Sequence, residues 1–178
     1  DLHKPDYTKQ FFTICDASDV GKGGMIYQLI DPTKPDDPDG SNRQVIGYYS
    51  KAFDDRMRDR PPYYRECDGL FWITEKAMKY ALCSPFPLIS KTDQKPLKWV
   101  LHSTKGAVVA WRIEVLEDID WRPEYIQGKL NFCADAMSRY PLVCPRTLSR
   151  LGLSNALKTL MKFLPIAMRD EPHLWVWG

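Results

Sequence analysis

Four aspartates are the residues of this sequence whose type and placement could carry out chemistry. Asp16 directly follows the apolar string QFFTIC, and Asp93 directly follows the string LISKT. Asp68 lies inside a long segment of helical periodicity, and Asp135 lies between two alanines near a second such segment. A carboxylate at the end of a buried strand is costly unless it is paired or ligated, and several carboxylates together repel one another. Bound cations would relieve both costs, so the four aspartates predict a metal site.

The chemistry that such a site predicts is hydrolysis of a phosphodiester. Magnesium prefers oxygen ligands, and two such ions about 4 Å apart can stabilise both the attacking and the leaving oxygen. This reaction needs carboxylates and no nucleophilic side chain. The sequence contains no GxSxG, HExxH or P-loop motif that would indicate a different chemistry.

The elements that must position these carboxylates can be predicted from the periodicity of apolar residues. We expect five strands, over 10–15, 25–30, 44–50, 87–92 and 121–126. We expect four helices, over 62–82, 95–101, 108–116 and 134–139, with Asn131 as the cap of the last one. Gly21, Gly23 and Gly24 predict a turn after the first strand, and the polar segment 31–42 predicts an exposed, mobile loop. The order β-β-β-α-β-α-α-β-α indicates an α/β fold with one mixed sheet flanked by helices.

The composition is that of a globular domain of ordinary size. The chain has 178 residues, of which 44% are hydrophobic and 27% charged, and its net charge of +2 neither indicates nor excludes nucleic-acid binding. The five cysteines have no metal-binding spacing, so we expect reduced, intracellular thiols. No apolar run is long enough to predict a membrane span. The first residues do not resemble a signal peptide, and we expect a chain cut from a longer one.

Five strings give the sequence its resemblance to a known family. In chain order they are CDASDVGKGGMIYQ, VIGYYSKAF, YYRECDGLFWI, KTDQKPLKWV and YIQGKLNFCADAMSRYP. Together they resemble the ribonuclease H domain of reverse transcriptases from gypsy-type LTR retrotransposons. The resemblance implies a ribonuclease H-like fold over residues 10–141. It leaves residues 1–9 as an N-terminal linker and 142–178 as a C-terminal helical extension or connector.

The resemblance also implies which residues bind the metal. The family's metal-binding aspartates correspond to Asp16, Asp93 and Asp135. The fourth carboxylate is normally a glutamate on the first long helix, where Glu66 and Asp68 compete. Asp68 lies 25 residues before Asp93, close to the family's interval, whereas a shift of two residues turns a side chain about 200° around a helix. The interval therefore favours Asp68, with Glu66 as the reserve.

Contacts to the substrate can be proposed from cations and polar groups near these motifs. The candidates are Ser18, Lys22, Gln94, Lys95, Lys98, Lys105, Arg112 and Arg139. Each could equally be an exposed polar or charged group on a solvated face. Related enzymes carry a histidine in the loop before the last helix; here residues 127–130 contain none, and Tyr125 is either a substitute or a packed strand aromatic.

The activity implied by the resemblance is cleavage of the RNA strand of RNA/DNA hybrids during reverse transcription. It implies two Mg²⁺ or Mn²⁺ ions, a polymerase domain of the same polyprotein as partner, no membrane, and an intracellular location in the cytoplasm or a retroelement particle. A second hypothesis is a catalytically weakened or inactive module that binds nucleic acid or a partner domain, favoured by Asp in place of Glu at position 68. A third, an integrase or resolvase, fits the strings less well and lacks a zinc-binding HHCC segment.

Overall fold

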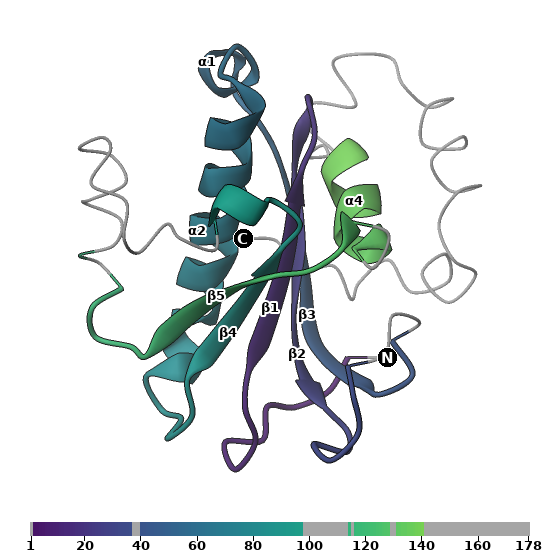
Figure 1. Cartoon of the computed structure of the whole chain (residues 1–178), viewed down its shortest axis with the longest axis vertical. Coiled ribbons are helices and arrows are strands. Elements are labelled where there is room, and N and C mark those ends of the chain that lie inside the picture. The colour runs from purple at the N-terminus through teal and green to yellow at the C-terminus, as the bar shows by residue number, and fades with distance from the viewer. Residues whose placement is uncertain (1, 37–39, 98–113, 115, 129–130, 141–178) are drawn as a thin grey trace.

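One mixed sheet of five strands forms the centre of the computed structural model, which describes residues 2–36, 40–97, 114, 116–128 and 131–140 (Figure 1). The strands are β1 (Phe12–Ala17), β2 (Gly21–Leu29), β3 (Arg43–Ala52), β4 (Leu88–Thr92) and β5 (Trp121–Tyr125), in the order β3-β2-β1-β4-β5. β1, β2 and β3 form an antiparallel meander, and β4 and β5 run parallel to β1. The predicted mixed five-stranded sheet is confirmed.

Helices cover both faces of this sheet. The long helix α2 (Pro62–Ala81) packs on one face, and α4 (Phe132–Arg139) packs on the opposite face (Figure 1). α2 begins at a proline, which is tolerated in a first turn because those amides lack intrahelical partners. A short helix that the sequence did not predict, α1 (Asp55–Arg58), precedes α2 and is capped by the Asp54 side chain.

A hydrogen-bond network around Ser90 lies among the apolar side chains between α2 and the sheet. The Ser90 hydroxyl on β4 accepts hydrogen bonds from Thr13 Oγ1 at 2.8 Å and from Trp121 Nε1 at 2.8 Å. Thr74 Oγ1 on α2 lies 3.0 Å from Ser90 Oγ and donates its own proton to Leu70 O, so Ser90 donates to Thr74. This network links β1, β4, β5 and α2, and each hydroxyl or indole proton in it forms a hydrogen bond.

The turn predicted at Gly21, Gly23 and Gly24 is wrong, since these residues begin β2 and the turn lies at 18–20. The glycines serve close packing instead. A Cβ on Gly23 would lie 2.5 Å from Met137 Cβ of α4, so only a residue without a side chain lets α4 approach β2 this closely.

The exposed, mobile loop predicted at 31–42 is anchored at Asp36. The Asp36 carboxylate accepts hydrogen bonds from Tyr27, Arg43 and Lys91, all on the sheet. Asn42 holds the other part of the loop through its side-chain amide, which donates to the carbonyl oxygens of residues 31, 34 and 35. Residues 32–35 and 41 are exposed as predicted, but these anchoring contacts could not be predicted because periodicity reports only apolar contacts.

Several predictions lie largely or wholly outside the described residues. They are the helices at 95–101 and 108–116 and the segment after residue 140. Of the first helix, only residues 95–97 are described, and they form a 3-10 turn. Cys15, Cys67, Cys83 and Cys133 are free thiols. Among the helices that the structure describes, none is both long and apolar enough to cross a membrane.

Candidate metal site

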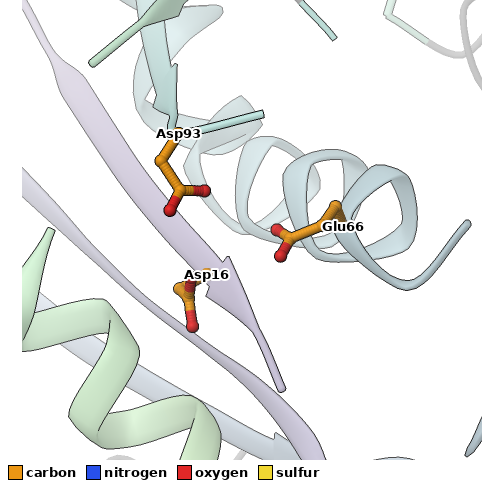
Figure 2. Close-up of side chains that lie close together, drawn as sticks. All are labelled: Asp16, Glu66 and Asp93. Atoms are coloured by element: carbon orange, nitrogen blue, oxygen red, sulfur yellow. The ribbon is translucent and has the colours of Figure 1, made fainter. Parts of the chain in front are cut away.

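Three carboxylates from three separate elements meet at one end of the sheet. Asp16 comes from β1, Glu66 from the second turn of α2, and Asp93 from the residue that follows β4 (Figure 2). Each offers one carboxylate oxygen such that the three atoms lie within 4.8 Å of one another. Figure 2 shows the three side chains pointing into one common space between the strand ends and α2.

The sheet register explains why Asp16 and Asp93 meet. β1 and β4 are parallel, with Phe12 opposite Ile89 and Ile14 opposite Lys91. Continuing that register by two residues places Asp16 opposite Asp93 at the carboxyl ends of both strands. Ligand sites of open α/β sheets form at such ends.

Helix α2 brings Glu66 to the same place because it crosses β1 closely. Gly69 faces the end of β1, where an added Cβ would stand 3.7 Å from Ala17 Cβ and 3.8 Å from Asp16 O. Glu66 lies one turn earlier, close to the same helix face, so its longer side chain reaches back over the strand end.

The structure brings Glu66, and not the preferred Asp68, into the group with Asp16 and Asp93. Asp68 lies two residues further along α2, about 200° around the helix, and its carboxylate forms a buried ion pair with Lys22 of β2. Lys22 also lies over the Trp72 ring, 5.1 Å from its centroid, and is only 7% exposed. Lys22 is therefore a core cation, and its prediction as a phosphate contact is wrong.

The electrostatics of the cluster favour a bound cation. Burial, followed by the charges of Asp16 and Asp93, raises the pKa of Glu66 to about 8. Burial also raises the pKa of Asp16 and of Asp93, although a hydrogen bond from Ser138 opposes the shift at Asp16. Three acids with raised pKa values are a group of like charges that lacks its counter-charge.

The unpaired oxygens of the cluster fit a divalent cation. Glu66 Oε2 and Asp93 Oδ1 are buried without a hydrogen-bond partner among the described residues. Carboxylate oxygens are the ligands that Mg²⁺ and Mn²⁺ prefer, and one ion would satisfy both atoms. The donor set therefore suits either metal.

Asp135, the fourth predicted carboxylate, lies near this cluster and outside its closest group. Asp135 is on α4, and its charge raises the pKa of both Asp16 and Asp93. It therefore lies at the same end of the sheet. Its Oδ1 accepts a hydrogen bond from Arg139 Nε at 2.7 Å.

Two polar residues beside the cluster were not predicted as part of the site. Ser138 of α4 is fully buried and donates from Oγ to Asp16 Oδ2 at 2.6 Å. Asn131 was predicted to cap α4, but its side chain makes no capping bond and instead donates to Cys15 O at 2.8 Å. Both belong to the fifth sequence string, which is the only signal that could have indicated them.

The substrate candidates have separate environments. Ser18 Oγ donates to Ser138 O at 2.7 Å and accepts from the amides of the following turn, so its hydroxyl is occupied. Gln94 is partly exposed directly after Asp93, and Lys95 is exposed with its amine over the Tyr125 ring. Arg139 is largely exposed beside Asp135. Arg112, Lys98 and Lys105 lie outside the described residues.

Gly128, in the histidine-free loop before α4, lies beside the cluster. A Cβ on Gly128 would lie 3.0 Å from Asp93 Oδ2, so glycine here leaves room for that carboxylate. Tyr125 is 36% exposed at the end of β5, and its ring contacts Lys95.

Comparisons with known proteins agree with the family that the sequence resembles. A family model described as the RNase H-like domain found in reverse transcriptase matches residues 6–117. The chain is 30% identical over 141 residues to the retrovirus-related Pol polyprotein from transposon 297 of Drosophila melanogaster, and 27% identical over 139 residues to that from transposon 412. Each match covers 78% of this chain, which spans only 12% and 10% of those two relatives.

Solved structures share the fold at low sequence identity. The foamy viral protease–reverse transcriptase in complex with double-stranded DNA matches 71% of this chain and 23% of its own, with a TM-score of 0.52 and 14% identity. The N-terminal RNase H domain of rv2228c from Mycobacterium tuberculosis, solved as a fusion with maltose-binding protein, matches 74% of this chain and 92% of its own, with a TM-score of 0.55 and 12% identity. The predicted ribonuclease H-like fold is therefore confirmed.

Proposed function

Because the chain belongs to the family of RNase H-like domains found in reverse transcriptases, we propose that it is a metal-dependent endonuclease that cleaves the RNA strand of RNA/DNA hybrids during reverse transcription. The observation that carries the proposal is the convergence of Asp16, Glu66 and Asp93 within 4.8 Å at the carboxyl ends of β1 and β4. Phosphodiester hydrolysis in such a site needs no further catalytic side chain.

The residues that would hold the metal are Asp16, Glu66 and Asp93, with Asp135 completing the set from α4. Two Mg²⁺ or Mn²⁺ ions bound here would supply Lewis-acid stabilisation of the attacking and leaving oxygens. The raised pKa of Glu66, about 8, supports this assignment, because a divalent cation would return that carboxylate to its charged form. The protein's own part is to hold these oxygens in place before the substrate arrives.

Contacts to the hybrid would surround this cluster. Gln94 directly follows Asp93 and is partly exposed, so it is placed to reach a group near the scissile phosphate. Lys95, two residues after Asp93, and Arg139, beside Asp135, are exposed cations that could neutralise phosphates. Ser18 is a weaker candidate, since its hydroxyl already holds the turn and α4.

The domain would act as one part of a longer polyprotein inside the cell. The curated relatives are Pol polyproteins of which this chain spans about a tenth, which supports a polymerase domain as partner. We propose residues 10–141 as the nuclease domain, residues 1–9 as a linker, and residues 142–178 as an extension or connector.

The alternative of a weakened or inactive module loses the observation that favoured it. That hypothesis depended on an aspartate replacing the family's glutamate on the first long helix. With Glu66 beside Asp16 and Asp93, the helix supplies the longer carboxylate that the family uses, and Asp68 has a separate partner in Lys22.

Cleavage of a labelled RNA/DNA hybrid tests the proposal. The full chain should cut the RNA strand with Mg²⁺ or Mn²⁺ and not with EDTA, and it should leave RNA paired with RNA uncut. Asp16→Asn and Glu66→Gln should each abolish cleavage while circular dichroism shows an intact fold. Asp68→Asn, if folded, should still cut, and loss of cleavage in Asp68→Asn with retention in Glu66→Gln would overturn the assignment.

A further inference from the structure

Ser138 of α4 donates a short side-chain hydrogen bond to the acidic cluster. Its Oγ lies 2.6 Å from Asp16 Oδ2 and 2.9 Å from Asp135 O, while Ser138 itself is fully buried. A hydroxyl carries one proton and can donate to only one of these acceptors. The carboxylate is the shorter and the charged acceptor, so it takes the proton whenever Asp16 is ionised.

Three contacts hold the Ser138 hydroxyl at this position. Ser18 Oγ donates to Ser138 O at 2.7 Å, and Ser50 Oγ donates to Met137 O at 2.9 Å. Gly23 allows α4 to lie against β2, since any Cβ there would collide with Met137. Helix α4 is therefore held against the turn after β1, against β2 and against β3, and these contacts oppose displacement of the hydroxyl.

This fixed hydroxyl has a consequence for the proposed metal ligand Asp16. Asp16, Glu66 and Asp93 repel one another when ionised, and an aspartate is free to rotate about two side-chain bonds. A donor fixed at Oδ2 opposes that rotation. We propose that Ser138 is a positioning residue that holds the Asp16 carboxylate in the orientation that binds the metal.

The inference rests on the proposed function, because it assigns Ser138 a role toward the same metal. Partners of metal-binding carboxylates in other proteins change metal affinity by about 10- to 100-fold when they are removed. Ser138→Ala should therefore weaken binding of Mn²⁺ by about tenfold or more. A purely structural serine would change stability without changing Mn²⁺ affinity in the folded protein.

The chain offers a matched control in Ser50. Its hydroxyl also donates to the α4 backbone, at Met137 O, and among the described side chains it forms no hydrogen bond with a carboxylate of the cluster. Like Ser138→Ala, Ser50→Ala removes one serine hydroxyl oxygen that helps to hold α4 against the sheet. Because the Ser18 bond to Ser138 O and the packing of α4 against Gly23 still hold the Ser138 hydroxyl, Ser50→Ala should leave Mn²⁺ affinity within about twofold of wild type.

Calorimetric titration of MnCl₂ into the full chain tests the inference, with wild type, Ser138→Ala and Ser50→Ala compared after circular dichroism confirms their fold. If Ser138→Ala does not fold, Ser138→Cys replaces it, because the somewhat larger thiol leaves no cavity and is a much weaker donor. The expected result is weaker Mn²⁺ binding in the Ser138 variant alone, with hybrid cleavage recovering at higher Mn²⁺ concentration.

The outcomes separate this inference from the proposed function. Wild-type protein that binds no Mn²⁺ and cuts no hybrid would overturn both. Wild-type protein that binds and cuts, with a folded Ser138→Ala or Ser138→Cys variant of unchanged affinity, would overturn the role of Ser138 alone. An equal loss of affinity in Ser50→Ala would also overturn it, because α4 attachment would then suffice as the cause.

Discussion

Replacing Glu66 with glutamine should stabilise the metal-free protein while removing its response to metal. Glutamine has nearly the shape of a protonated glutamate and carries no charge. In the folded protein, burial and the charges of Asp16 and Asp93 raise the pKa of Glu66 from 4.5 to about 8. The unfolded chain ionises this group freely near its ordinary value, so the wild-type fold must either keep a proton or bear a buried charge.

The size of the effect follows from the two pKa values. The pKa of Glu66 is higher in the folded protein than in the unfolded chain. Protonated Glu66 therefore makes its full contribution to the free energy of unfolding below pH 4.5, and this contribution is lost as pH rises through about 8. The loss grows by about 1.4 kcal/mol for each pH unit between these values. It reaches at most about 3 kcal/mol at pH 7 and about 5 kcal/mol above pH 8. Glutamine avoids this loss.

Urea unfolding of wild type and Glu66→Gln in EDTA measures the difference. The two free energies of unfolding should nearly coincide at pH 5, and the variant should be the more stable by up to about 3 kcal/mol at pH 7. Addition of Mn²⁺ should then stabilise the wild type and leave the variant unchanged, because a ligand stabilises only the fold that binds it.

Asp68→Asn is the matched control on the same helix. It leaves the Lys22 amine buried without its carboxylate partner, which should cost about 3–5 kcal/mol with or without metal. If folded, it should still be stabilised by Mn²⁺. The reasoning is refuted if Glu66→Gln is the less stable protein in EDTA at pH 8, or if Mn²⁺ stabilises it as much as wild type.

Three further substitutions test how the fold supports the site. Ser90→Ala should cost about 1–3 kcal/mol in urea unfolding, because the buried Trp121 Nε1 loses its acceptor; an unchanged midpoint would contradict the network. Replacing Lys22 and Asp68 together by leucine should destabilise less than either single replacement, since no unpaired buried charge remains, and additive losses in a double-mutant cycle would argue against the ion pair. Gly23→Ala should cost at least about 1–3 kcal/mol by overpacking against α4, and calorimetry should show a lower Tm; a Tm equal to wild type would mean that α4 can withdraw at no cost.

The strands and α2 could be predicted because their signals are local. A strand that is buried on one or both faces needs a short apolar run, and a helix that packs along one face needs a 3.6-residue period. The five predicted strands agree with the structure within about four residues at each end, as element boundaries usually do. The turn predicted at Gly23 was wrong because this glycine is required by the packing of α4, which is far away in the sequence.

Contacts between distant segments could not be predicted for the same reason. The loop at 31–42 has no apolar face, yet Asp36 reaches three donors on β2, β3 and β4. Ser138 and Asp16 are separated by 122 residues. Neither pairing leaves a periodic trace in the sequence.

By itself the sequence determined the family, the mixed sheet and the two aspartates at strand ends. Asp16 and Asp93 each follow an apolar run, and a helix between the two strands makes them parallel, so both aspartates lie at the same end of the sheet. Only the tertiary structure decided between Glu66 and Asp68. Both lie on one helix two residues apart, and spacing along the chain cannot tell which one faces the sheet end. That choice depends on the rotation of α2 about its axis, which follows from the apolar face that α2 buries against the sheet and from the pairing of Lys22 with Asp68.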